Sequence, residues 1–218
     1  MPAVKTYNQY CGLARALDLV GDRWALLVVR ELLEGPRRYN ELLEGLPGIA
    51  TNLLAERLRE LESGGVIERR DGGRYALTPW GQGLHEPIYA LGRWAGPLMR
   101  ERGEAAFRPQ WLRHMVFARF EGVDPERREM VVELHVDGGE PYGLVSSGGR
   151  VHLVRGPASS PDVTLTGPAD GVAGLLGGRM GLDDARARGV KVKGDARMLG
   201  GLRPRTGAPS KARTSVAP

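Results

Sequence analysis

The sequence has only one cysteine among its 218 residues, Cys11. A single cysteine excludes an internal disulfide framework and a zinc site made of several thiolates, and it suits a reducing compartment. Long apolar runs are also missing, since no stretch approaches the ~20 consecutive apolar residues of a membrane-spanning helix. The first residues lack the apolar core of a signal peptide as well. We therefore expect a cytoplasmic protein that has no membrane partner.

Patterns typical of catalysis and metal binding are likewise scarce. No nucleophile, acid–base pair or phosphate-binding loop stands out. The four histidines show neither the paired spacing of metal ligands nor a serine, cysteine or aspartate motif around them; they are His85, His114, His135 and His152. We expect no enzyme activity, no cofactor and no metal site.

Basic charge is present but unevenly placed. The net charge is +5, which by itself would favour a nucleic-acid partner. Basic and acidic side chains nearly balance in 1–102 and in 103–202, whereas 203–218 has four basic side chains and no acidic one. The total charge therefore says little about DNA binding. The tail 203–218 has few apolar residues, and we expect it to be disordered.

The pattern of 1–102 predicts a domain of helices with one hairpin. The predicted elements are a helix that ends at Gly21, a helix over 23–34 capped by Asp22, a short helix capped by Asn40, a helix over 51–63, strands over 66–70 and 74–77, and a helix that begins after Thr78 and runs to 102. The strands flank the turn 71–73, where two glycines allow positive φ. This order predicts a winged helix-turn-helix, whose helix after the turn enters the major groove of DNA.

The helix predicted over 51–63 has two different faces. Leu54, Leu58 and Leu61 form an apolar stripe at helical spacing, and Arg57 flanks it, where we expect a structural or phosphate-contacting role. The candidate DNA-contacting residues opposite the stripe and at its flank are Thr51, Asn52, Ala55, Glu56 and Arg59. Asparagine can pair with adenine and arginine with guanine, whereas glutamate can accept a hydrogen bond from a cytosine amino group or exclude other bases.

Five more arginines lie where a wing and the preceding turn would meet the DNA backbone. Arg69, Arg70 and Arg74 are on the predicted hairpin strands, which can meet the minor groove or the flanking phosphates. Arg37 and Arg38 lie just before the third helix, whose free backbone N–H groups can hold a phosphate. The alternative is that these are solvated arginines of an ordinary helical domain, because arginine is the usual basic residue throughout this chain.

Four short motifs connect this part of the chain with a known family. They are a cysteine that opens the first helix, GDRW at the start of the second, GPRRY before the third and LPGI before the fourth. With these motifs, residues 8–100 resemble the HxlR-type regulators, which are relatives of the MarR type. The resemblance implies a transcription regulator, with repression as the expected mode, that binds an operator in double-stranded DNA as a homodimer.

The resemblance also implies roles for individual residues. The first and last helices of the domain would supply the dimer contacts, through Leu13, Leu17, Ile88, Leu91, Trp94 and Leu98, although each of these could instead belong to the core of one chain. Cys11 would be a possible thiol redox sensor, with a small buried apolar group as the alternative. Many relatives have serine at the position of Ala50, so we expect Thr51 or Asn52 to cap the fourth helix.

From about residue 107 short β-rich runs alternate with glycine turns. The predicted strands lie over 115–120, 130–136, 142–146, 151–154, 163–166 and 190–193, and the predicted helices lie over 169–176, over 182–187 and after Asp195. The fold class is therefore predicted as α+β, with a winged helix-turn-helix domain for DNA binding and dimerisation over 1–102. An α+β domain with an antiparallel sheet follows over 107–202.

The end of this second domain, from DVTLTG to the final helix, is similar to sterol carrier protein-like domains. Such domains enclose an apolar tunnel for lipids or acyl thioesters. The resemblance implies a ligand pocket lined by Phe117, Leu134, Leu144, Leu153, Leu165, Leu175, Leu176, Met180 and Leu199. The alternative is that these side chains fill a closed core or a dimer interface.

Two functions follow as hypotheses. The first is a one-component transcription factor in which an apolar effector changes the spacing of two recognition helices, which must lie about one DNA turn (~34 Å) apart. The second is a lipid or acyl-thioester binding protein whose helical domain mainly dimerises.

Overall fold

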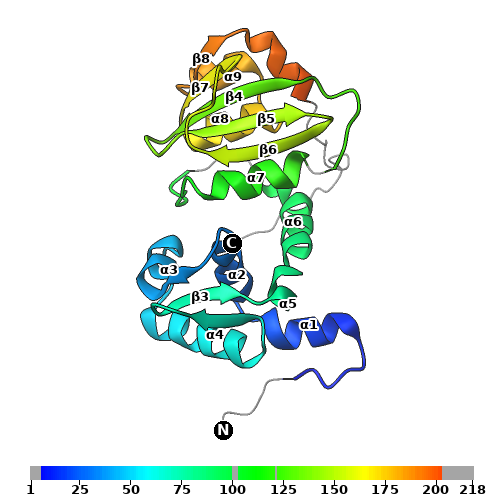
Figure 1. Cartoon of the computed structure of the whole chain (residues 1–218), viewed down its shortest axis with the longest axis vertical. Coiled ribbons are helices and arrows are strands. Elements are labelled where there is room, and N and C mark those ends of the chain that lie inside the picture. The colour runs from blue at the N-terminus through cyan, green and yellow to red at the C-terminus, as the bar shows by residue number, and fades with distance from the viewer. Residues whose placement is uncertain (1–5, 100–102, 121, 203–218) are drawn as a thin grey trace. The chain divides into compact units, whose positions relative to one another are not determined.

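The computed structural model describes residues 6–99, 103–120 and 122–202. The chain divides into two compact units, of which the first ends at Ile88 and the second begins at Tyr89 (Figure 1). This division falls inside the helix His85–Trp94. The domain bounds expected from the sequence, 1–102 and 107–202, stay predictions. The expected disordered tail 203–218 lies outside the described residues. None of the described helices has the length and apolar character needed to cross a membrane.

The first unit has the element order of a winged helix-turn-helix. Its elements are α1 (Gly12–Val20), α2 (Ala25–Leu33), β1 (Arg37–Arg38), α3 (Tyr39–Gly45), α4 (Thr51–Ser63), β2 (Ile67–Arg70), β3 (Arg74–Leu77), α5 (Pro79–Gln82) and the start of α6 (His85–Trp94). The hairpin of β2 and β3, which we call the wing, is joined by β1 into a sheet of order β1-β3-β2. Gly72 and Gly73 in the turn have φ values of +73° and +69°, as the sequence predicts.

The helix after the turn, α4, has the predicted bounds and the predicted apolar stripe. Leu54, Leu58 and Leu61 are completely or almost completely buried in the core of the first unit. Gly64 and Gly65 follow the helix, and the N–H of Gly64 donates to the carbonyl of Glu60 at 2.8 Å. The stripe therefore fixes which face of α4 lies inward and leaves the opposite face in solvent.

The start of α2 differs from the prediction. The helix begins at Ala25 after Trp24, whose backbone is left-handed with φ +83°, and no side chain caps it. The expected cap by the Asp22 side chain is therefore wrong. The carbonyl of Asp22 accepts from the N–H of Ala25 at 3.0 Å, while its carboxylate bonds to Arg57 on α4. Asp22 thus joins two elements rather than capping one.

The last predicted helix of the first domain is broken into shorter pieces. Thr78 caps α5 as predicted, since its hydroxyl oxygen accepts from the N–H of Gly81 at 3.0 Å. The α-helical hydrogen-bond pattern is then interrupted before α6 and again after it, where a 3-10 turn, η1 (Gly96–Leu98), follows. Pro97 has no backbone N–H to continue the α-helical pattern, which accounts for the end of α6. The expected continuation to 102 enters residues outside the description.

The second unit is built on one five-stranded sheet. Its further elements are α7 (Trp111–Phe120), β4 (Met130–Val136), β5 (Tyr142–Ser147), β6 (Arg150–Arg155), β7 (Val163–Gly167), α8 (Ala169–Leu176), α9 (Leu182–Ala187), β8 (Lys191–Gly194) and a 3-10 segment η2 (Ala196–Leu202). The strand order is β6-β5-β4-β7-β8. Helices α7 and α8 pack against the sheet (Figure 1). The predicted α+β class is confirmed.

Two local predictions for this unit are wrong. The segment 115–120, expected as a strand, belongs to helix α7, where Leu112, Val116 and Phe120 are buried at helical spacing. The sheet is antiparallel except that β4 and β7 run parallel. A parallel neighbour needs a crossover connection, and here the segment between β6 and β7 provides it. This segment contacts β4, since the N–H of Ala158 donates to Glu133 Oε2 at 2.8 Å.

Candidate nucleic-acid interface

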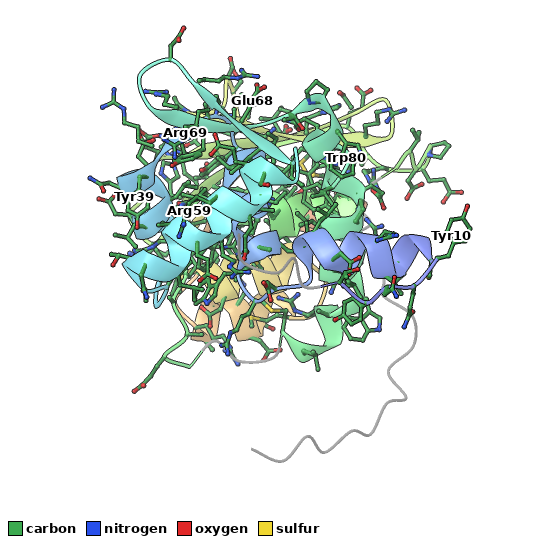
Figure 2. The ribbon with its side chains drawn as sticks, turned by 90° about the horizontal axis from the view of Figure 1, so that it is seen from below. Tyr10, Tyr39, Arg59, Glu68, Arg69 and Trp80 are labelled. Atoms are coloured by element: carbon green, nitrogen blue, oxygen red, sulfur yellow. The ribbon has the colours of Figure 1, made fainter. Side chains whose placement is uncertain are left out.

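The outward face of α4 presents the polar side chains that the sequence predicts. Asn52, Glu56 and Arg59, which we call the DNA face of α4, are exposed, as is Thr51, while Ala55 is half-buried at the flank. Arg59 lies on the outer side of α4 in Figure 2, and Tyr39 and Arg69 lie on the same side of the first unit in that view. The face is thus free to meet a major groove.

The start of α4 is capped differently from the prediction. Ala50 is the N-cap and no side chain makes a capping hydrogen bond, so the expected cap by Thr51 or Asn52 is wrong. The Asn52 side chain is therefore not held by the backbone of its own helix. A contact that sequence analysis missed lies here instead, since the hydroxyl of Tyr39 donates to the carbonyl of Thr51 at 2.6 Å.

Arg59 is the candidate guanine-contacting residue. Its Nε donates to the Ala55 carbonyl one turn earlier at 3.3 Å. Among the described residues no acidic side chain forms an ion pair with it. The two terminal nitrogens of the guanidinium are the groups that pair bidentately with guanine, so Arg59 has the freedom that this contact requires.

Three arginines stand side by side across the wing sheet. In the strand register Arg38 of β1 lies opposite Arg74 of β3, and Arg74 lies opposite Arg70 of β2. All three are exposed, and we call them the arginine row. One acidic side chain is close, since Glu68 Oε1 is 2.8 Å from Arg70 Nη2. Like charges directly opposite in a sheet are destabilising, so this row is suited to an external anion such as the DNA backbone.

The remaining two arginines lie on the other face of the same sheet. Arg37 and Arg69 both pair in register with Tyr75, which is buried. The guanidinium of Arg69 lies 5.2 Å from the centre of the Tyr75 ring, and its Nε is 3.4 Å from a carboxylate oxygen of Glu62 on α4. Arg69 therefore supports the packing of the wing on α4, and the five predicted arginines do not form one surface.

The wing also borders a shallow hollow of about 520 Å³. It is lined by Pro36, Glu68, Arg69, Arg70, Asp71 and Arg74. At the start of α3 the N–H of Arg38 donates to Glu41 Oε2 at 2.6 Å, so a carboxylate of the protein itself takes this one N–H group. The phosphate site expected there, beside Arg37 and Arg38, stays a prediction.

The predicted dimer residues are mostly in solvent. Leu13 on α1 is 68% exposed and Trp94 on α6 is 77% exposed. Leu17, Leu91 and Leu98 are also exposed. Ile88 differs from the others, since it is half-buried and packs against the core of the first unit.

Cys11 lies directly before α1, at its N-cap position, and is exposed. The alternative of a buried apolar cysteine is therefore wrong. The backbone N–H groups of Ala14 and Leu13 at the start of the helix stabilise the thiolate and hold the pKa of the thiol below its ordinary value. An exposed thiol with a lowered pKa has the properties of a reactive cysteine.

The predicted pocket residues of the second unit lie mostly in one packed core. Leu134, Leu144 and Leu165 have no exposed surface, and the cluster also contains Leu153 and Leu176. Three further members are only partly buried at its border; they are Leu175, Met180 and Leu199. Phe117 does not belong to that core, and its ring lies 5.7 Å from the ring of Tyr89. The pocket itself stays a prediction.

Comparison with known proteins places the similarity in the first half of the chain. A family model described as HxlR-like helix-turn-helix matches residues 19–102. The uncharacterized HTH-type transcriptional regulator sll1512 of Synechocystis is 46% identical over 87 residues, which are 37% of this chain and 64% of that protein. The HTH-type transcriptional regulator YodB of Bacillus subtilis is 36% identical over 86 residues, which are 37% of this chain and 77% of that protein.

A crystal structure of quinone-bound YodB is 36% identical and covers 39% of this chain and 96% of its own, with a TM-score of 0.37. The chain thus covers most of YodB and somewhat less than two thirds of sll1512. Over these shared residues it carries the helix, turn, helix and wing described above. The chain belongs to the HxlR-like helix-turn-helix family of transcriptional regulators.

Proposed function

We propose that this HxlR-like regulator represses transcription in the cytoplasm by binding a DNA operator as a homodimer, with α4 of each protomer in a major groove. The observation that supports it most directly is the combination of an exposed DNA face on α4 with the arginine row on the wing. Polar side chains on a recognition helix specify bases, and arginines beside it position the protein on phosphates.

An operator selected from a random duplex library allows a direct test. We expect Arg59→Ala to lower affinity for the operator by about tenfold and to change affinity for random DNA much less. Arg150→Ala is the matched control, because Arg150 is an exposed arginine of β6 in the second unit and its removal changes the net charge equally. An equal loss on operator and random DNA would show that Arg59 makes no base contact.

Homodimer formation through α1 and α6 is the second part of the proposal. Leu13 and Leu17 lie one turn apart on α1, and Leu91 and Trp94 lie one turn apart on α6, all exposed. Exposed apolar side chains at helical spacing are typical of surfaces that pair with another helix. A second copy of the chain would remove these side chains from water.

Control by an apolar ligand in the second unit is the third part. It is supported by the resemblance of 115–202 to sterol carrier protein-like domains and by the partly buried Leu175, Met180 and Leu199 at the border of the packed core. We expect fatty acids or acyl thioesters that bind the protein to change operator affinity. If such ligands bind and operator affinity stays constant, this part of the proposal fails.

The alternative is a lipid or acyl-thioester carrier whose helical unit only dimerises. That function predicts DNA binding that depends on salt but not on base sequence. The operator selection described above separates the two, because a carrier would enrich no sequence from the library. A regulator needs no catalytic step, and we propose that the protein is not an enzyme.

A further inference from the structure

Arg57 is the buried arginine of the recognition helix. Only 4% of its surface is exposed, whereas its neighbours Glu56 and Arg59 are exposed. It lies on α4 beside the leucine stripe that faces the core. Burying a guanidinium costs free energy unless charged or polar partners surround it. The partners of Arg57 therefore explain why it can be buried.

Three carboxylates surround this guanidinium. Arg57 Nη1 bonds to Asp22 and lies 2.5 Å from Glu60 Oε2, and Arg57 Nη2 lies 3.1 Å from Glu56 Oε1. Its Nε has no hydrogen-bond partner in the described part of the chain. One buried cation is therefore shared between Asp22, which lies 35 positions earlier in the chain, and two glutamates of its own helix.

Asp22 lies in the connection between α1 and α2. Trp24, two residues later, has a left-handed backbone conformation, which is strained for a residue with a large side chain. The Trp24 ring also lies beside Gly48 in the turn between α3 and α4. The Asp22 carboxylate thus bonds to Arg57 from outside the recognition helix.

Glu56 is the partner of Arg57 that belongs to the exposed DNA face of α4. Its side chain is 51% exposed although one oxygen is held by Arg57, and it belongs to the DNA face of α4. A carboxylate next to DNA is normally repelled by the phosphates. The adjacent Arg57 charge weakens this repulsion and limits the positions that the carboxylate can take.

We propose that Arg57 is a positioning residue that holds Glu56 in the orientation needed to accept a hydrogen bond from the amino group of a cytosine in the operator. Asp22 completes the arrangement by fixing Arg57 from outside the helix. The inference rests on the proposed function, because it requires α4 to lie in the major groove, where the cytosine amino group is displayed. It adds to the proposed function two residues that never touch DNA, Arg57 and Asp22, and that decide how Glu56 is oriented.

The test measures the affinity of the full chain for the selected operator and for each of its single-base-pair variants at constant salt. We expect Glu56→Gln to reduce discrimination by about tenfold at one C·G pair and to leave the preferences at other positions in place. Asp22→Asn should reduce discrimination at that same pair, although Asp22 is not on the DNA face.

Glu60→Gln is the matched control. Glu60 contacts the same guanidinium, but it belongs to α4 itself and, unlike Asp22, does not tie Arg57 to another element. It also lies nearer the C-terminal end of α4, whereas recognition helices contact bases mainly through their N-terminal residues. We expect this variant to keep the complete base preference. Preserved preferences at the other positions show in the same experiment that each variant is folded.

The proposal is overturned if Glu56→Gln keeps every base preference of the unmodified protein, or if Asp22→Asn lowers all preferences equally. Neither result affects the proposed function, which depends on operator selection and on Arg59. Conversely, a protein that enriches no operator at all would contradict the proposed function itself.

Discussion

The hydroxyl of Tyr39 donates a 2.6 Å hydrogen bond to the backbone carbonyl of Thr51, and this bond joins the first residue of α3 to the first residue of α4. The two helices of the helix-turn-helix are therefore tied at the end that approaches DNA. We expect Tyr39→Phe to lower the free energy of unfolding by about 1 kcal/mol or less, because the bond is exposed, and to weaken operator binding.

Tyr10→Phe is the control for this prediction, because Tyr10 is a fully exposed tyrosine that precedes α1 (Figure 2). Thermal unfolding followed by circular dichroism and operator titration measure the two effects. A Tyr39→Phe variant as stable and as tight-binding as Tyr10→Phe would show that the bond contributes nothing.

The arginine row predicts opposite effects on stability and on DNA affinity. Arg74 lies opposite both Arg38 and Arg70, so replacing it removes a like-charge repulsion on each side. We therefore expect Arg74→Gln to raise the free energy of unfolding of the free protein slightly, by about 0.2–1 kcal/mol. The same change should weaken operator and random DNA alike and reduce the slope of log affinity against log salt by about 1. Loss of affinity without a change in slope would argue against a phosphate contact.

The exposed aromatic residue of α6 predicts a change in assembly. Trp94 is 77% exposed, and we expect Trp94→Glu to shift the protein from dimer to monomer in analytical ultracentrifugation, since a buried charge without a partner destabilises an interface. Trp80→Glu is the comparison, because Trp80 is also exposed but lies on α5. If both variants remain dimeric, α6 does not form the interface.

The lowered pKa of Cys11 predicts that its thiolate forms, and reacts, at a lower pH than that of an ordinary cysteine. The backbone N–H groups of Ala14 and Leu13 stabilise the thiolate, so the folded protein loses the thiol proton at a lower pH than the unfolded chain does. We expect the pH midpoint of alkylation by iodoacetamide to lie lower for native protein than for protein in urea, as measured by mass spectrometry. Equal midpoints would remove the physical basis for Cys11 as the thiol sensor that the family resemblance implies.

Local patterns were enough to predict the elements of the candidate nucleic-acid interface. The helix over 51–63 was predicted with its observed bounds because three leucines at helical spacing and two following glycines mark its face and its end. The hairpin was predicted because two adjacent glycines allow the positive φ that its turn requires. Such signals depend only on neighbouring residues, so the sequence displays them directly.

Contacts between distant residues could not be predicted in this way. The sequence suggested separate roles for Asp22, as a helix cap, and for Arg57, as a structural or phosphate-contacting residue. Only the packing of α4 against the α1–α2 connection brings the two together. The parallel pairing of β4 with β7 depends on a crossover whose path no local pattern encodes. Segment 115–120 was wrongly predicted as a strand, because a short apolar run fits both the two-residue period of a strand and the 3.6-residue period of a helix. Only the earlier Leu112, which is also buried, favours the helix.

Strand β1 is only two residues long, yet it sits between the wing and the helix-turn-helix. Arg38 ends β1, pairs with Arg74 of the wing and directly precedes α3. The wing is therefore not a free arm, since any swing of the hairpin would pull on the start of α3. In the proposed dimer on DNA, the wing and α4 of one protomer would therefore meet their half-site as one connected unit, and adjustment to operators of different length would fall to the contact between the two protomers.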